Sequence, residues 1–162
     1  MANHFETLIY QFYDWQGCVV KCNIRVARLE PGGYAGELDV VVYDPKVPEV
    51  IHYEPSLDGD SWAERERRYK KKFELGRMHI FKDVFPWVSS RTPIRQIAVF
   101  NNVPVNRKDF VGAEAKSIED LVKEMKDKIG ACGYVGENAI PEKYDLLRTI
   151  QLVICGYYTD PK

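Results

Sequence analysis

The sequence predicts an α/β domain in which helices cover both faces of a central mixed β-sheet, giving three layers. Two observations lead to this fold class. Segments with apolar residues three and four positions apart, which are typical of helices, alternate along the chain with short apolar or alternating runs, which are typical of strands. No internal repeat or low-complexity segment interrupts the 162 residues. We therefore expect a single domain over residues 1–162.

Helical spacing marks three segments, and a fourth is ambiguous. A capping-box pattern marks the start of residues 3–14. The polar Asn3 is followed three positions later by Glu6, and these two side chains are expected to satisfy free backbone groups at the helix start. A second helix is expected from residue 61 to about residue 75, ending before a glycine, and a third over residues 118–129. Residues 141–155 fit a helix or a strand, and a proline suited to the first helical turn favours the helix.

Four segments carry strand patterns. Residues 18–29 alternate apolar and polar side chains, as expected for a strand with one exposed face. Residues 38–43 form a short apolar run typical of a strand buried on both faces, and residues 50–54 and 94–100 are further strands. The expected order is therefore helix, strand, strand, strand, helix, strand, helix. In the first strand, one face should carry Val20, Cys22, Ile24 and Val26.

Composition and charge indicate a cytoplasmic protein without a membrane partner. No apolar run approaches the roughly 20 residues that span a bilayer, and Glu6 interrupts the region where a signal peptide needs a continuous apolar core. The four cysteines lack the paired spacing of a zinc site and are expected to be reduced thiols. A net charge of −1 argues against nonspecific coating of nucleic acid by the whole surface, although it leaves room for a local basic patch.

Two acidic residues lie where a buried strand makes them costly. Asp39 stands at the head of an apolar strand, and Glu54 stands at the end of the next one. A charged side chain in such a place is unfavourable unless it is paired or binds a cation, and two carboxylates from neighbouring strands repel each other unless a divalent metal joins them. Mg²⁺ suits this pair, with Mn²⁺ as an alternative, because it needs only one or two carboxylates beside water and phosphate oxygens. The chemistry that follows is phosphodiester hydrolysis.

This arrangement resembles the PD-(D/E)XK nuclease superfamily, which has the restriction endonuclease-like fold. That family carries an acidic residue on its first helix, an aspartate on its second strand and a Glu-x-Lys tripeptide on its third. Glu6, Asp39 and Glu54 stand in these places, within residues 3–100. The resemblance implies that Asp39 and Glu54 are metal ligands with catalytic roles, that Glu6 supports them, and that the protein binds DNA and cleaves it with Mg²⁺.

The sequence departs from the family at the tripeptide, where Ser56 replaces the lysine that orients or helps to deprotonate the attacking water. Some members of the family move this basic group to the following helix. That helix offers Arg65 and Arg68 in its first two turns, whereas Lys72 starts about 16 Å along the helix axis. The resemblance therefore implies a catalytic role for Arg65, with Arg68 as the other substitute.

A basic run in the second helix is the candidate nucleic-acid interface. Six of the eight residues between positions 65 and 72 are Lys or Arg, and such clusters bind phosphates electrostatically. The same run fits a solvated helix face, because glutamates are interleaved with it. The residues expected to contact nucleic acid are Arg65, Arg68, Lys71 and Lys72.

Several alternatives stay open. Glu6 also fits a plain helix cap, and His52, which shares the strand face of Glu54, is either a ligand or a packed core residue. The function expected is that of a DNA-binding, Mg²⁺-dependent deoxyribonuclease, which is a hydrolase. Its rival is a catalytically inactive nuclease-fold module that binds DNA or protein, and an unrelated α/β domain with surface acids is a third option. A second copy of the chain, forming a homodimer, is an alternative partner to DNA.

Overall fold

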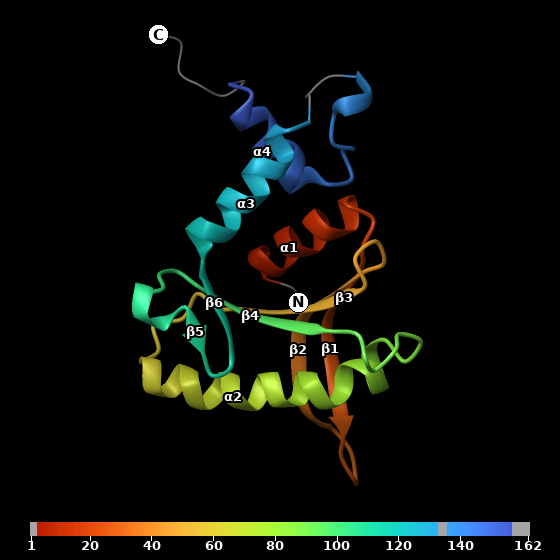
Figure 1. The fold of residues 1–162 in the computed structure, drawn as a ribbon, viewed down its shortest axis with the longest axis vertical. Helices are drawn as coiled ribbons and strands as arrows, with labels where there is room; N and C mark the ends of the chain where they lie inside the picture. The colour runs from red at the N-terminus through yellow and green to blue at the C-terminus, as the bar shows by residue number, and fades with distance from the viewer. Residues whose placement is uncertain (1–2, 133–135, 157–162) are drawn as a thin grey trace.

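The computed structural model describes residues 3–132 and 136–156, which contain a six-stranded mixed β-sheet. Its strands are β1 (Val19–Arg28), β2 (Tyr34–Asp44), β3 (Glu49–Pro55), β4 (Ile94–Phe100), β5 (Asp109–Phe110) and β6 (Ala113–Ser117). They follow the order β1-β2-β3-β4-β6-β5 across the sheet (Figure 1). The first three strands are antiparallel neighbours, β4 is parallel to both β3 and β6, and β5 is antiparallel to β6.

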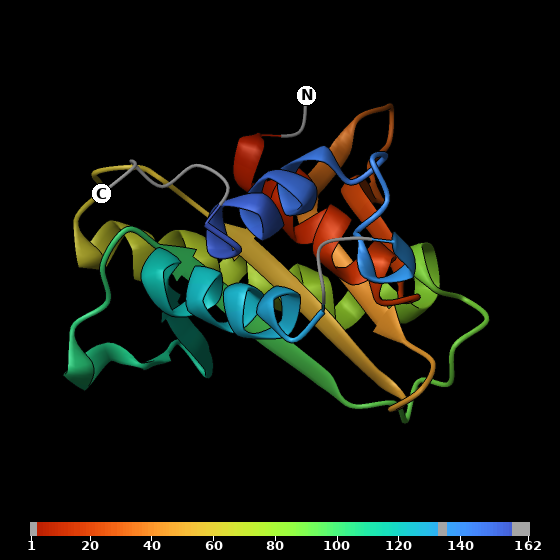
Figure 2. The same ribbon diagram turned by 90° about the horizontal axis from the view of Figure 1, so that it is seen from above.

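Helices lie on both sides of this sheet. They are α1 (His4–Trp15), α2 (Trp62–His79), α3 (Ile118–Gly130) and α4 (Asp145–Ile154). Helix α2 lies along one face of the sheet, and the other three lie on the opposite side (Figure 1). The view from above shows α1, α3 and α4 over the sheet, with α2 beneath it (Figure 2). The α/β class and the mixed sheet that the sequence predicts are therefore confirmed.

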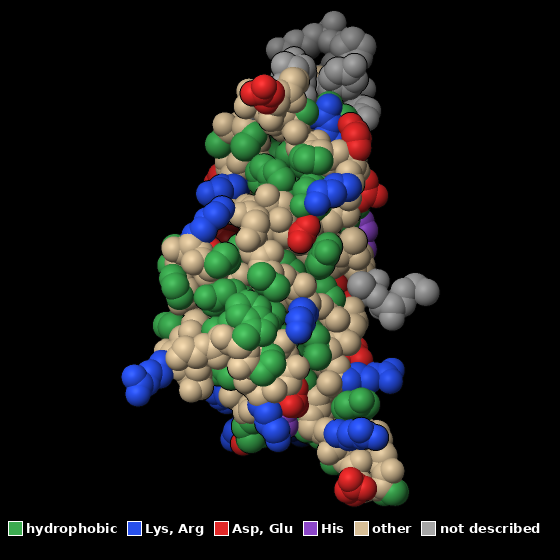
Figure 3. Space-filling view, turned by 90° about the vertical axis from the view of Figure 1, so that its right-hand side faces the viewer, with side chains coloured by type: hydrophobic (Ala, Val, Ile, Leu, Met, Phe, Trp, Pro, Cys, Tyr) green, Lys and Arg blue, Asp and Glu red, His purple; other side chains and the backbone are tan. Residues whose placement is uncertain are grey.

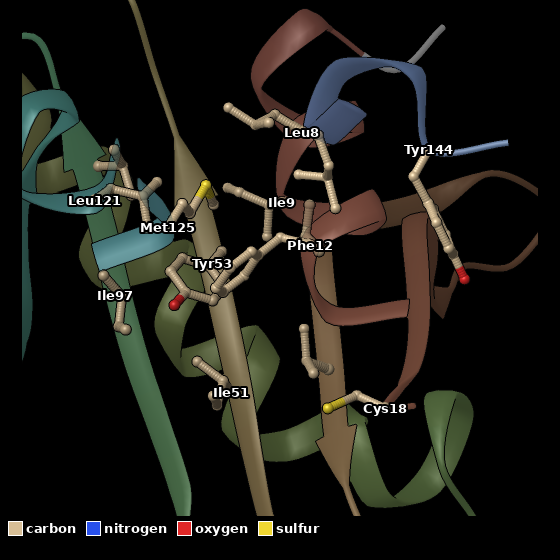
Figure 4. Close-up of a cluster of buried hydrophobic side chains, with 14 of the residues drawn as sticks. Leu8, Ile9, Phe12, Cys18, Ile51, Tyr53, Ile97, Leu121, Met125 and Tyr144 are labelled. Atoms are coloured by element: carbon tan, nitrogen blue, oxygen red, sulfur yellow. The ribbon is translucent and has the colours of Figure 1, made fainter. Parts of the chain in front are cut away.

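A hydrophobic core joins α1, α3 and α4 to the sheet. Ile9 of α1 and Met125 of α3 pack over Tyr53 and Ile97 of the central strands (Figure 4). The hydroxyl groups of Tyr53 and Tyr13 share a hydrogen bond of 2.6 Å, which satisfies the polar end of the buried ring. Each fully buried side chain of this size contributes roughly 1.5 to 3 kcal/mol. This core fixes α1 and α3 against the sheet.

On the other face, aromatic side chains hold α2. Tyr69 and Phe73 of α2 pack in one cluster with Phe100 of β4 and Phe110 of β5. The rings of Tyr69 and Phe100 meet edge to face with 5.0 Å between their centroids, an arrangement that aromatic quadrupoles favour. This packing fixes the position of α2 along its axis, and so determines which helix residues reach the strand acids.

Helix α2 is longer than the sequence predicts. It continues past Gly76 to His79 and is followed by a short π-helix at Ile80–Val84. An end before Gly76 was expected because glycine commonly follows a helix C-terminus. Here the glycine allows a close approach, since a Cβ at this position would lie 2.5 Å from His52 Nδ1. The residue therefore serves packing between α2 and β3, and it does not end the helix.

The sequence analysis missed β5 and β6, and it left one segment ambiguous. β5 has two residues, and β6 reads AEAKS, a short alternation whose apolar positions are alanines, which favour helices over strands. β6 is a strand because it pairs in parallel with β4. Residues 141–155 contain α4, which begins at Asp145, so the preference for a helix is confirmed there.

The first strand does not keep one apolar face, so that expectation is wrong. Val20 and Cys22 pack toward the core under α1, whereas Ile24 and Val26 pack toward α2. The side chains exchange faces at Asn23, whose φ of 53° lies in the left-handed region. In the described pairing of β1 with β2, Cys22 and Ile24 have partners and Asn23 has none. Because the two-residue repeat requires extended residues throughout, one left-handed residue exchanges the two faces.

The described surface carries several exposed hydrophobic side chains. Val47 and Trp87 are among them, and the Trp87 ring meets Tyr43 edge to face with 5.2 Å between centroids. Figure 3 shows hydrophobic side chains gathered near the middle of one side, with charged side chains around them. Within residues 3–132 and 136–156, no helix is both long enough and apolar enough to cross a membrane.

Candidate active site

Asp39 and Glu54 lie next to each other where β2 and β3 stop pairing. The last residue pair of the two strands joins Val40 to Tyr53, which are the sequence neighbours of Asp39 and Glu54. Beyond it, the backbone N–H of Asp39 donates to Glu54 Oε1 at 3.2 Å. The side chain of Glu54 is fully buried, and that of Asp39 is 17% exposed. The pair is therefore anchored in the sheet and reaches solvent through Asp39.

Lys72 of α2 joins the two carboxylates. Its Nζ lies 3.1 and 3.0 Å from the two oxygens of Asp39 and also donates to Glu54 Oε2. The acids that the sequence places on neighbouring strands thus face the same side of the sheet and share one cation. The side chains of Lys72 and Asp39 are 30% and 17% exposed, so the site is partly open to solvent.

The structure places Lys72 against the acids, although its distance along the helix axis favoured Arg65. Helix α2 starts over the end of β4, where Trp62 packs edge to face on Phe100. It then runs back along the sheet until Gly76 approaches β3. The start of the helix therefore lies away from the acid pair, and a residue in its middle lies over the pair.

Arg65 and Arg68 instead hold the loop between β3 and α2. Arg65 donates to the Asp58 carboxylate at 3.3 Å and to the Asp58 backbone oxygen at 2.7 Å. Arg68 donates to Asp58 and, at 2.6 Å, to Asp60. Ser56, which stands where the family has lysine, also donates to Asp58. In the described structure both arginines are engaged by this loop and form no ion pair with the strand acids.

Replacing Asp58 with Asn should destabilise the protein at neutral pH, and the difference should fade in acid. Burial raises the pKa of Asp58, but hydrogen bonds from Ser56 and Arg68 outweigh it and lower the pKa from 3.8 to about 2. A carboxyl group with a lowered pKa stabilises the fold above its ordinary pKa, and this contribution is lost as the pH falls toward 2. Urea unfolding should show a loss of about 1 kcal/mol at pH 7 and a smaller one at pH 3. An equal loss at both pH values would contradict this account.

The two carboxyl groups beside Lys72 differ in their affinity for a proton. Burial and then repulsion by Glu54 raise the pKa of Asp39 to about 8, although Lys72 opposes the shift. Burial also raises the pKa of Glu54, but the His52 hydrogen bond and Lys72 outweigh it and lower the pKa to about 2. Burial lowers the pKa of Lys72, whereas the two acids raise it, and the acids prevail. Lys72 and Glu54 are therefore ionised at neutral pH, and Asp39 retains affinity for a proton or a further cation.

The donor atoms suit a small, hard cation with few protein ligands. Asp39 offers two oxygens and Glu54 offers Oε2, and all three face Lys72. Mg²⁺ prefers such oxygens, and it keeps several waters and takes phosphate oxygens in its remaining positions. In the part of the chain that the structure describes, no group of three or more His, Cys, Asp or Glu residues is arranged to hold a metal. A divalent cation at this site would therefore have two protein carboxylates as ligands, those of Asp39 and Glu54.

Glu6 caps α1 on the side of the sheet opposite α2. The capping box is present: Asn3 accepts from the Glu6 backbone at 2.9 Å, and Glu6 accepts from the Asn3 backbone at 3.2 Å. Glu6 Oε2 also accepts from Asn23 at 3.1 Å. Burial, followed by Glu6 and Asp39, raises the pKa of Cys22 to about 11. Glu6 and Asp39 thus both act on Cys22, but the described hydrogen bonds of Glu6 hold the start of α1 and β1.

Three further basic residues in the middle of α2 face solvent. Arg67, Lys70 and Lys71 are exposed, whereas Arg65 is buried. Of the four residues expected to contact nucleic acid, Lys71 is thus exposed, Lys72 binds the acid pair, and Arg65 and Arg68 bind the loop. The exposed residues form a short basic strip on the outer side of the helix.

The helical spacing in the sequence indicates that Lys72 faces the sheet. Tyr69, Lys72 and Gly76 are three and four residues apart, so they share one helix face. Tyr69 on this face donates to the backbone oxygen of Glu54 at 3.2 Å. The aromatic residue therefore marked the face that meets the sheet, and Lys72 lies on that face.

Comparison with known proteins gives no family. No model of a protein family matches the chain, and no curated protein sequence matches it. The function is therefore argued from the geometry of Asp39, Glu54 and Lys72.

Proposed function

We propose that this chain is a PD-(D/E)XK-like nuclease domain with a three-layer, restriction endonuclease-like fold, which binds DNA and hydrolyses phosphodiester bonds with Mg²⁺ or Mn²⁺. The observation that carries the proposal is the contact of Lys72 with both Asp39 and Glu54. The motif of that superfamily combines two strand acids with a lysine. Here the lysine comes from α2, which compensates for Ser56.

Each residue has a role that follows from its contacts. A bound divalent cation lowers the pKa of its water and stabilises charge on the phosphate. Asp39 and Glu54 hold that cation, because their available oxygens face one point beside α2. The ammonium group of Lys72, which contacts both carboxylates in a partly exposed site, orients a water molecule or binds a phosphate oxygen. Tyr69 anchors β3 beside the site through the backbone of Glu54.

One observation favours a second candidate function, the inactive nuclease-fold module. Lys72 already contacts both carboxylates, and such an ion-pair network is able to hold α2 on the sheet without any metal. In that case the domain binds DNA or an acidic protein surface without cleaving it. The two candidates differ in whether a divalent cation changes what the protein does.

DNA is the partner that the outer side of α2 suits. Arg67, Lys70 and Lys71 are exposed there, and Lys and Arg side chains on one helix face bind phosphates. Lys71 of the strip is the sequence neighbour of Lys72, so the strip adjoins the helix residue that contacts the acid pair. A second copy of the chain is the alternative partner, and the molecular mass in solution distinguishes a monomer from a homodimer.

Cleavage of plasmid and single-stranded DNA tests the proposal. The purified protein should cut one of them with Mg²⁺ or Mn²⁺ and should not cut with a chelator present. Asp39→Asn should remove cleavage, because the cation loses an anchor, whereas Asp127→Asn, which changes an exposed acid on α3, should retain it. DNA binding without cleavage under any divalent cation would support the inactive module instead.

A further inference from the structure

A chain of polar side chains leads through the protein to Glu54. Arg77 donates to Gln96 Oε1 at 2.5 Å, Gln96 Nε2 lies 3.1 Å from His52 Nδ1, and His52 Nε2 lies 2.7 Å from Glu54 Oε1. His52 and Glu54 are fully buried, and Gln96 is 7% exposed. A hydrophobic side chain at position 52 would fill the same space and would need no hydrogen-bond partners, whereas His52 needs two. The polar chain therefore indicates a chemical role.

The partners of Gln96 fix the orientation of its amide group. Arg77 is a donor only, so the atom that it contacts is the amide oxygen. The backbone carbonyl of Phe73 is an acceptor only, and the atom 2.8 Å from it is therefore the amide nitrogen. With one hydrogen directed at Phe73, the other is directed at His52.

The orientation of Gln96 in turn fixes the proton on His52. Because Gln96 donates to Nδ1, this nitrogen accepts and carries no hydrogen. An imidazole that accepts at Nδ1 carries its hydrogen on Nε2, and that hydrogen is directed at Glu54 Oε1. The chain from Arg77 to Glu54 is thus a series of donors that all point toward the carboxylate.

We infer that His52 is a positioning residue that holds Glu54 so that only Oε2 is available to a divalent cation. Oε1 accepts from His52 at 2.7 Å and from the backbone of Asp39 at 3.2 Å, whereas Oε2 faces Lys72. A carboxylate that binds through one oxygen suits six-coordinate Mg²⁺ or Mn²⁺, whereas Ca²⁺ has more ligands and accepts bidentate carboxylates. The inference rests on the proposed function, because it takes Glu54 to be a ligand, and it adds a preference for small cations.

Close packing keeps the imidazole in this position. The ring meets Phe73 edge to face with 5.7 Å between centroids. On another side Gly76 leaves no room for a Cβ, which would lie 2.5 Å from Nδ1 and 2.7 Å from Cε1. Phe73 and Gly76 therefore pack against the ring on two sides, as a residue with a positioning role requires.

Calorimetric titration of the protein with Mn²⁺ and with Ca²⁺, without DNA, tests this role. His52→Leu removes the donor to Glu54, whereas His52→Gln keeps an amide donor. We expect His52→Leu to weaken Mn²⁺ binding about 10- to 100-fold and Ca²⁺ binding by less, so that the preference for Mn²⁺ falls. His52→Gln should restore most of the Mn²⁺ affinity. A residue that only supported the fold would leave the preference between the two cations unchanged.

Nitrogen NMR of the unaltered protein gives a second measurement that needs no variant. The His52 ring should show a protonated Nε2 and an unprotonated Nδ1, and a proton on Nδ1 would overturn the inference. A folded His52→Leu protein with unchanged affinity for both cations would also overturn it, while Mn²⁺ binding by the unaltered protein would leave the proposed function standing. An unaltered protein that neither binds Mn²⁺ nor cleaves DNA would overturn both.

Discussion

Replacing Lys72 with Met should lower the free energy of unfolding by roughly 3 kcal/mol, because it leaves the buried charge of Glu54 without its cation. DNA cleavage should fall by about 10²- to 10³-fold, since a preorganised positive group at the site of developing charge is lost. Adding Mg²⁺ should raise the melting temperature of the variant more than that of the unaltered protein, because the metal replaces the missing charge between the carboxylates. Urea unfolding, a cleavage assay and thermal melts measure the three effects.

Lys71→Met is the matched control for this substitution. It removes the same charge from the neighbouring position of the same helix, but Lys71 is exposed. Its free energy of unfolding should change by no more than about 0.5 kcal/mol. If the two variants are equally stable, Lys72 has no special relation to the acid pair, and the account of the site is wrong.

Gly76→Ala should destabilise the protein by about 1 to 3 kcal/mol, the range found for overpacked cores. Helix propensity alone predicts the opposite sign, since alanine is favoured over glycine by about 1 kcal/mol inside a helix. Packing prevails because the new Cβ would lie 2.5 Å from His52 and 3.0 Å from Gln96, both of which are held by hydrogen bonds. Urea unfolding measures the free-energy difference from the unaltered protein.

Gly59→Ala provides the comparison for this prediction. Gly59 lies in the loop before α2, and a Cβ there would meet no atom within 4 Å. This variant should be as stable as the unaltered protein, or more stable because its unfolded chain is less flexible. A stabilising effect of Gly76→Ala would show that α2 does not lie against His52 as described.

Much of the fold follows from local sequence signals. The Asn3 and Glu6 capping box predicts the start of α1, and the run at residues 94–100 coincides with β4. The apolar strand that contains Asp39 and the following strand that ends near Glu54 are neighbours in a hairpin, so the sequence also predicts that the two acids approach each other. These features depend on residues close together in the chain.

The features that the sequence analysis missed depend on distant packing. The helical spacing indicates that Lys72 faces the sheet, but it does not show which strand residues Lys72 meets. Lys72 contacts Asp39 and Glu54 because the aromatic cluster around Tyr69 sets the position of α2 along the sheet. The exchange of faces in β1 depends on a left-handed Asn23, a conformation that its neighbours in the sequence do not require. The role of His52 emerges from Gln96, which is distant in sequence and becomes a neighbour through β3 and β4 pairing.

Binding of Mn²⁺ in the absence of DNA tests the central claim, that Asp39 and Glu54 form a divalent-cation site beside Lys72. Electron paramagnetic resonance of free Mn²⁺, titrated with the protein, measures the bound fraction directly. The account predicts one Mn²⁺ bound per chain, competition by Mg²⁺, and loss of binding in Asp39→Asn but not in Asp127→Asn. Equal binding by the unaltered protein and Asp39→Asn, or no binding by either, would contradict it.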